Sequence, residues 1–168
     1  MSRSFAALTT LVVLGSLLAV TSVSAGEGCS ISGTDGSDRI EGTDRADVIC
    51  ARAGNDRVMA KAGSDTIRGG AGWDWLHGGV QLDTISGGQG QDVLIGGDHH
   101  DVLRGGSGDD RIRGGNWPDR LLGGSGDDVL DAVDVTSGIN VVRAGGGEDL
   151  CRVESEDEWR GCETVRMP

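Results

Sequence analysis

The chain is 168 residues long, and its composition excludes an ordinary globular domain built on an aromatic core. Glycine accounts for 31 residues, tyrosine is absent and the only phenylalanine is Phe5, whereas globular proteins contain about 7% glycine. The formal net charge of −12 excludes the strongly basic balance typical of nucleic-acid-binding proteins, and it makes cations the expected partners. Stability must come from something other than large packed side chains.

The first 25 residues have the layout of a secretory signal peptide. Arg3 provides a short basic start, an apolar run extends from Phe5 to Val20, and small residues precede the expected cleavage point after Ala25. The apolar run is shorter than the ~20 residues that span a bilayer, and no later segment is apolar enough to do so. The leader therefore predicts a secreted, extracellular mature protein that does not insert into membranes.

Residues 33–131 consist of eleven consecutive nine-residue units without a gap. Residues 87–95 are a typical unit, with glycine at positions one, two and four. Position six is aspartate in every unit: Asp38, Asp47, Asp56, Asp65, Asp74, Asp83, Asp92, Asp101, Asp110, Asp119 and Asp128. Position eight is always aliphatic: Ile40, Ile49, Val58, Ile67, Leu76, Ile85, Leu94, Leu103, Ile112, Leu121 and Leu130. Repetition at a fixed period indicates stacked units that bury their apolar residues against one another.

Each unit predicts a tight turn followed by a very short strand. Glycine at positions one, two and four permits the positive φ angles of a turn, and positions seven to nine suit a strand with an inward apolar centre. Two units would complete one coil of 18 residues, and successive coils would stack their strands in parallel. The predicted fold class is therefore all-β, a parallel β-roll (a right-handed β-solenoid).

Stacking of this kind places the aspartates of alternate units about 4.8 Å apart, which is one strand spacing. Like charges at that distance repel by about 1 kcal/mol per neighbouring pair even at the dielectric constant of water. A column of carboxylates is therefore unstable unless cations lie between the coils. A set of roughly six to eight oxygen ligands, from carboxylates and backbone carbonyls, is the preference of calcium and not of zinc or copper.

The unit resembles the glycine- and aspartate-rich nonapeptide of the RTX, or haemolysin-type, calcium-binding proteins. The resemblance covers residues 33–131, and residues 31–38 and 151–166 also resemble the start and the cysteine-bridged tail of such arrays. It implies a β-roll that binds Ca²⁺ between successive turns of the same edge, through aspartate carboxylates and backbone carbonyls, and that is largely unfolded without the metal. The implied ligands are the eleven position-six aspartates and turn carbonyls, among them those of Gly70, Gly72, Gly88, Gly90, Gly106, Gly108, Gly124 and Gly126. The alternative, a disordered linker, does not explain the unbroken aliphatic column.

The two edges of such a roll would differ. Odd-numbered units all carry glycine at position four, whereas even-numbered units carry Arg45, Gly63, Gln81, His99 and Trp117. If position four adopts a left-handed conformation, a residue with a bulky side chain costs about 1–2 kcal/mol there. The hypothesis that follows is weaker calcium binding, or fewer sites, on the even-unit edge. The alternative is that these turns adjust and bind calcium through their intact aspartate column.

Four cysteines in an exported chain predict disulfides, with three connectivities open. Proximity in sequence favours Cys29–Cys50 and Cys151–Cys162, one bridge at each end of the array. The ends of a solenoid lack a neighbouring unit and need caps. The predicted organisation is a signal peptide (1–25), an N-terminal cap with the first repeat (26–41), an eleven-repeat calcium-binding roll (33–131) and a C-terminal cap (132–168).

The function predicted from these features is a secreted, non-enzymatic protein that binds Ca²⁺ and folds on binding. No nucleophile lies next to a base outside the repeat pattern, and the period accounts for the paired carboxylates as metal ligands. The alternative is a calcium-stabilised extracellular adhesion or interaction module with a protein or glycan partner. Trp73, Trp75 and Trp117 are the candidate contact residues for that alternative, since they occupy outward or turn positions.

Overall fold

The computed structural model describes residues 28–134 and 138–168, so the predicted signal peptide lies outside the described residues. The described chain forms two eight-stranded parallel sheets, here called sheet A and sheet B. Sheet A contains β1 (Ile31–Ser32), β3 (Val48–Ala53), β5 (Thr66–Ala71), β7 (Thr84–Gln89), β9 (Val102–Ser107), β11 (Arg120–Ser125), β13 (Val141–Gly146) and β15 (Glu158–Arg160). Sheet B contains β2 (Arg39–Glu41), β4 (Arg57–Ala62), β6 (Trp75–Val80), β8 (Val93–Asp98), β10 (Arg111–Asn116), β12 (Val129–Asp131), β14 (Leu150–Arg152) and β16 (Thr164–Arg166).

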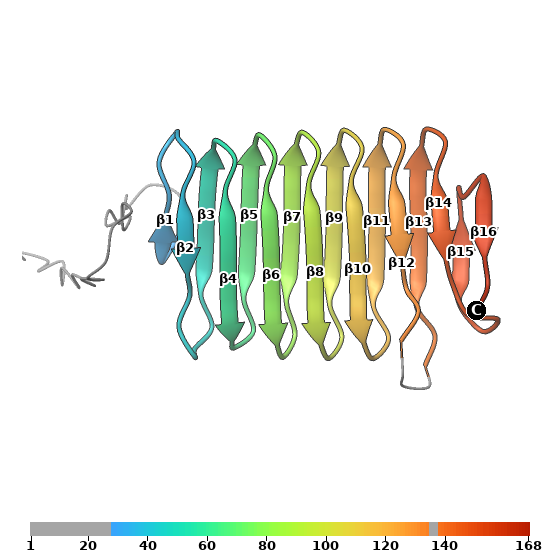
Figure 1. Ribbon diagram of the computed structural model, residues 1–168. Coiled ribbons are helices and arrows are strands. Elements are labelled where there is room, and N and C mark those ends of the chain that lie inside the picture. The colour runs from blue at the N-terminus through green and yellow to red at the C-terminus, as the bar shows by residue number, and fades with distance from the viewer. Residues whose placement is uncertain (1–27, 135–137) are drawn as a thin grey trace, which may run out of the picture.

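The chain alternates between the two sheets, so that one strand from each sheet makes one coil of a parallel β-roll. Each strand pairs with the strand two further along the chain, as Ile49 does with Ile67 and Leu76 with Leu94. The partners are 18 residues apart, which is two nine-residue units. Figure 1 shows the coils following one another along a single axis, with the first strands at one end and the C-terminus at the other. The predicted fold class is confirmed.

The core is one ladder of position-eight side chains between the sheets. From Ile40 to Leu130 these aliphatic residues are all buried, and Val142, Cys151 and Val153 extend the ladder into the tail. Each residue packs against its equivalents one coil away, because the strands are in register. The interior is therefore too thin for large aromatic side chains, which explains how a chain so poor in them can fold.

Most strands are longer than the three residues expected, because positions one to three of the following unit continue them. β5 and β9, for example, are both six residues long. Position-one residues are buried. In β5, for example, Gly69 lies between residues 66–68 and residues 70–71, all of which pair with β7. Position two has a positive φ in most units. Position one itself does not have a positive φ, so its predicted turn role is wrong. The turn proper is confined to positions four to six.

The roll continues through the tail, where the offset between paired residues changes from 18 to 21 and then, in the last coil, to 17 in sheet A and 14 in sheet B. Leu121 pairs with Val142 and Leu130 with Cys151 across this break. Both predicted disulfides are present, Cys29–Cys50 and Cys151–Cys162, one near each end. At the C-terminal end Trp159 pairs with Val142 but is exposed, whereas the partly buried Cys162 and Val165 pack against the core. Within the described ranges no helix is long and apolar enough to cross a membrane.

Candidate metal centre

The position-six aspartates form two columns, one along each edge of the roll. Each lies at the end of a turn, immediately before a strand, and every one from Asp38 to Asp128 is buried. We call the edge that follows the strands of sheet A the regular edge. Its column contains Asp38, Asp56, Asp74, Asp92, Asp110 and Asp128, and Asp149 continues it. The opposite, irregular edge carries Asp47, Asp65, Asp83, Asp101 and Asp119, followed by Asn140.

From Asp56 and Asp65 onward, one carboxylate oxygen of each aspartate accepts a backbone N–H from the preceding coil. The backbone N–H of Asp74 donates to Oδ1 of Asp92 at 2.9 Å, and the N–H of Asp92 donates to Oδ1 of Asp110 at the same distance. The irregular edge has the same arrangement, with the N–H of Asp83 on Oδ1 of Asp101 at 2.8 Å. These carboxylates are thereby held between two coils, in the same orientation.

The second carboxylate oxygen has no protein partner in most units. Oδ2 is buried and lacks a hydrogen bond in Asp56, Asp65, Asp74, Asp83, Asp92, Asp101, Asp110, Asp128 and Asp149. Burial of an uncompensated carboxylate raises its pKa, to about 6 for Asp92 and about 8 for Asp101. In both, the N–H bond from the preceding coil lowers the pKa, and neighbouring carboxylates raise it further. Left alone, such oxygens are costly to bury.

Glycine at position one makes room for these carboxylates. A Cβ atom on Gly87 would overlap Oδ2 of Asp92, and one on Gly105 would overlap Oδ2 of Asp110. At positions two and four the backbone has a positive φ, for example 121° at Gly88 and 117° at Gly90. There a Cβ atom would overlap the carbonyl oxygen of the preceding coil, so the glycine carbonyls stack closely along the edge.

The donor set of each edge consists of carboxylate and carbonyl oxygens. In the described part of the chain, no three side chains of His, Cys, Asp or Glu converge as a metal-binding cluster. A cation between two coils would therefore draw on the aspartates together with turn carbonyls. Hard oxygen donors in a flexible arrangement fit Ca²⁺ better than the softer transition metals. The partnerless Oδ2 atoms are where the expected metal fits.

A family model described as the RTX calcium-binding nonapeptide repeat matches four times, at residues 32–67, 51–85, 81–112 and 104–134. Together these matches cover more than half of the chain. The chain belongs to the RTX calcium-binding repeat family. No curated protein matches the chain closely enough to be added to this assignment. Calcium is the expected ligand of RTX repeats, and the predicted family, fold class and metal are confirmed.

The first RTX unit on each edge differs from the rest, because a threonine at position two satisfies the aspartate. The backbone N–H and the hydroxyl of Thr34 both donate to Oδ2 of Asp38, at 2.7 and 2.9 Å. Thr43 makes the same two contacts with Asp47 at 2.8 Å. At the N-terminal end of each column, protein donors therefore satisfy the Oδ2 atom that has no partner in most later units.

At the C-terminal end of the irregular edge, Asn140 replaces aspartate. Its Oδ1 accepts the N–H of Asp119 at 2.7 Å, as an aspartate would. Its Nδ2 donates to the carbonyl of Ala132 at 2.9 Å and to Oδ1 of Asp157 at 3.1 Å. On the regular edge, Glu163 closes the column by accepting the N–H of Asp149. The repeat pattern does not reveal Asn140, Asp157 and Glu163, because the changed offset in the tail conceals their register.

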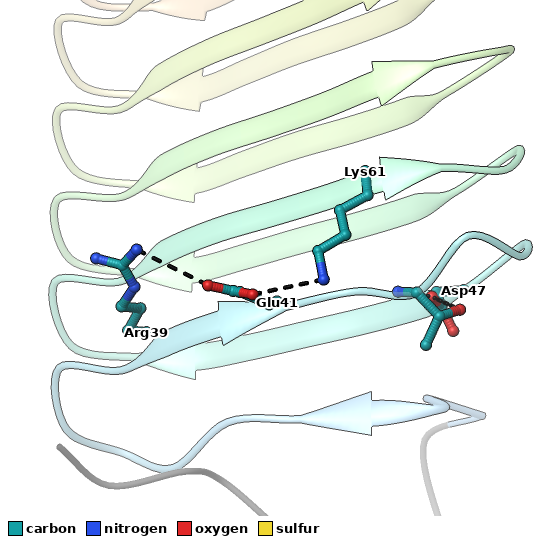
Figure 2. A network of polar contacts seen from close by, with 5 residues as sticks. Arg39, Glu41, Asp47 and Lys61 are labelled. Atoms are coloured by element: carbon teal, nitrogen blue, oxygen red, sulfur yellow. Dashed lines mark hydrogen bonds and ion pairs between the residues drawn. The ribbon is translucent and has the colours of Figure 1, made fainter. Parts of the chain in front are cut away.

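Acidic residues on the strand faces are a separate group from the edge columns. Figure 2 shows Glu41 between Arg39 and Lys61 on the face of sheet B, with Asp47 apart from them at the irregular edge. Glu41 lies 3.8 Å from Arg39 and 3.4 Å from Lys61. Lys61 therefore pairs with Glu41 on the face of sheet B, and no ion pair joins it to an aspartate of the irregular edge.

Position four of the irregular edge adopts the conformation that glycine favours even where glycine is absent. The φ angles of Gln81, His99 and Trp117 are 83°, 82° and 80°. His99 and Trp117, one coil apart, stack with ring centroids 5.8 Å apart. Arg45, near the N-terminal end, has no positive φ. The strain anticipated at position four is therefore present in three of these turns.

The three candidate contact tryptophans lie on different surfaces of the roll. Trp73 is in a turn of the regular edge, Trp75 is on the outer face of β6, and Trp117 is on the irregular edge. The Trp75 ring contacts two neighbouring side chains. The Arg57 guanidinium lies 3.8 Å from its centroid, and the His77 ring stacks on it with the centroids 5.7 Å apart. These residues do not form one contact patch.

Proposed function

We propose that this chain is a secreted, non-enzymatic calcium-binding protein whose roll folds as calcium binds. The observation that carries the proposal is the repeated buried Oδ2 atom without a partner, on consecutive coils of both edges. Calcium supplies the positive charge that these carboxylates lack. Because the sites form only when coils stack, the free energy of binding contributes directly to folding.

The proposed ligands are the eleven position-six aspartates together with turn carbonyls, including those of the position-two and position-four glycines. Asp38 and Asp47 contribute least, because Thr34 and Thr43 already bond their Oδ2 atoms. Two features of the chain position these ligands. Backbone N–H groups of the preceding coil orient the carboxylates, and the position-one glycines leave space for them.

The irregular edge is proposed to bind calcium more weakly than the regular edge. Support comes from the positive φ angles of Gln81, His99 and Trp117, which the metal-bound turns must keep at a cost of about 1–2 kcal/mol each. The regular edge carries glycine at the same position from Gly54 to Gly126. Secretion is supported by the leader of residues 1–25 and by the two disulfides, which persist in oxidising compartments.

Isothermal titration calorimetry of the calcium-free, oxidised protein tests this function. We expect several calcium ions per chain in two affinity classes, the tighter one lost when regular-edge aspartates are replaced, and no saturable binding of magnesium. Absence of calcium binding would overturn the proposal. A single affinity class, equally weakened by substitutions on either edge, would overturn the ranking of the edges.

A further inference from the structure

The charges of the roll are sorted between its edges and its faces. The turns carry most of the acidic residues, and among the described basic residues only Arg45 lies outside a strand. In sheet A, Glu158 is the only acidic residue within the strands. Five exposed arginines project from this sheet: Arg68, Arg104, Arg120, Arg143 and Arg160. We call these residues the arginine face. The strands of sheet B also carry more basic than acidic residues, the acidic ones being Glu41, Asp98 and Asp131. A protein of formal charge −12 therefore has basic strand faces, and the arginine face is the one with the fewest acidic residues.

The arginine face has a regular order along the roll. Arg68, Ser86, Arg104, Leu122, Arg143 and Arg160 occupy equivalent outward positions on successive strands. Neighbouring strands lie about 4.8 Å apart, so Arg68, Arg104 and Arg143 recur at intervals of roughly 9–10 Å. Arg120 lies beside this column, two residues before Leu122 on β11. The result is a line of guanidinium groups parallel to the axis of the roll, on a rigid sheet.

These guanidinium groups have no acidic partner among the described residues. The ion pairs of the described chain are Arg39–Glu41, Lys61–Glu41 and Arg152–Asp131, all on sheet B. On sheet A the one contact of this kind is weak, from Arg68 to the Sγ atom of Cys50 at 3.6 Å. Ion pairs thus neutralise part of the positive charge of sheet B, whereas none of the five arginines of the arginine face makes one. Arg111 and Arg113 of sheet B also make no ion pair among the described residues, so they provide a matched comparison.

We propose that the arginine face binds a linear acidic polysaccharide, with its carboxylate or sulfate groups on the arginine column. Guanidinium groups bind such anions through paired hydrogen bonds, and the threonine and serine hydroxyls between them suit sugar hydroxyl groups. A single chain along the column stays within the width of the six-residue strands, roughly 20 Å. It therefore avoids the acidic turns on either side.

The same geometry disfavours other polyanions. An anionic membrane would extend beyond the strands and meet both acidic edges, where like charges repel it. Single-stranded nucleic acids bind through aromatic rings that stack on the bases. The only aromatic residue in the strands of sheet A is Trp159, at the last coil. This inference goes beyond calcium binding, which serves here to hold the face rigid.

Binding to two polysaccharides in calcium tests the proposal. Dextran sulfate supplies sulfate groups, hyaluronate supplies carboxylates, and neutral dextran is the uncharged control. The test variant is R104Q/R143Q, and the matched control is R111Q/R113Q, which removes two exposed arginines from sheet B. Circular dichroism in calcium verifies that both variants keep the fold.

We expect saturable binding of at least one acidic polysaccharide, weakened about tenfold or more in R104Q/R143Q and less than twofold in R111Q/R113Q. The binding should also weaken as salt is added. Three results would overturn the proposal: no binding of either acidic polysaccharide, equal weakening in both variants, or equally tight binding of a single-stranded DNA oligonucleotide or of phosphatidylglycerol vesicles. The last two outcomes would assign the effect to net charge or to another class of partner. Circular dichroism in calcium reports the fold separately, so a folded roll that fails to bind is distinguished from a roll that fails to fold.

Discussion

Replacing Asp92 by asparagine should have opposite effects with and without calcium. Asp92 lies in the middle of the regular edge, is 1% exposed, and has a buried Oδ2 without a partner. An asparagine keeps Oδ1 as the acceptor for the N–H of Asp74. Asn140 shows how the amide nitrogen is satisfied, since its Nδ2 donates to the position-one carbonyl of its own turn. In Asp92→Asn the equivalent carbonyl belongs to Gly87.

The expected magnitude follows from the column spacing. At pH 8 Asp92 carries a charge, and Asp74 and Asp110 are its neighbours one coil away. Each neighbouring pair at about 4.8 Å contributes roughly 1 kcal/mol of repulsion at the dielectric constant of water. The substitution should therefore stabilise the calcium-free roll by about 1–2 kcal/mol. It should weaken calcium binding about tenfold or more, which corresponds to ~1.4 kcal/mol, because a carboxylate is lost.

Two titrations followed by circular dichroism measure these effects. In chelator, trimethylamine oxide drives folding, and the variant should need less of it than the unchanged protein. In the second titration, the variant should need more calcium to fold. Asp44→Asn is the matched control, because Asp44 is exposed and outside both columns. A variant that needs more of both agents would refute the argument that Oδ2 is a repulsive charge which the metal neutralises.

Three further predictions concern protons and backbone conformation. Burial raises the pKa of Asp101 in the folded roll to about 8 and that of Asp92 to about 6. Protonation of these carboxyls therefore stabilises the folded, calcium-free roll. This stabilisation is complete below the unfolded-state pKa of about 4 and is lost as the pH rises through 6–8. Circular dichroism in chelator should therefore detect more folded protein at pH 4–5 than at pH 8, whereas calorimetry should find calcium affinity falling as the solution is acidified. Gly90→Ala should lower the free energy of unfolding of the calcium-loaded roll by about 1–3 kcal/mol, because φ is 117° and the added Cβ overlaps the Gly72 carbonyl. Gly146→Ala, where the Cβ enters open space, should change that free energy by less than about 0.5 kcal/mol. Thermal unfolding measures both. Gln81→Gly should lower the calcium concentration at which half of the protein is folded. Relief of about 1–2 kcal/mol of backbone strain at φ 83° exceeds the entropic cost of roughly 0.5–1 kcal/mol for glycine. A higher calcium concentration at half-folding would contradict this prediction.

The period of nine predicted most of the roll, because stacked coils repeat the same environment. The aspartate and aliphatic columns, the 18-residue coil and the terminal disulfides all follow from spacing alone. The role of position one does not follow from the period, because glycine at a fixed position serves either a positive φ or a close approach. The three-dimensional structure shows that the role is a close approach. The carboxylate that fills the space beside Gly87 belongs to Asp92, five residues later.

The ends of the columns could not be predicted, because they depend on particular contacts and not on the period. Thr34 looks like an ordinary substitution at position two until its donors are found on Asp38. Asn140 is hidden by the shift of the offset from 18 to 21 residues. The arginine face, by contrast, is present in the outward columns of the repeat. The net charge of the whole chain conceals this face, because a single number does not show how the charges are divided between edges and strands.

The central claim is that calcium binding and folding of the roll are coupled, and a calcium titration of residues 26–168 followed by far-UV circular dichroism tests it most directly. The oxidised protein in chelator at pH 8 should lack most of its β signal. Calcium should restore the signal in one cooperative transition, and magnesium at the same concentration should not. A roll that is already fully folded in chelator, with no change on adding calcium, would contradict the claim.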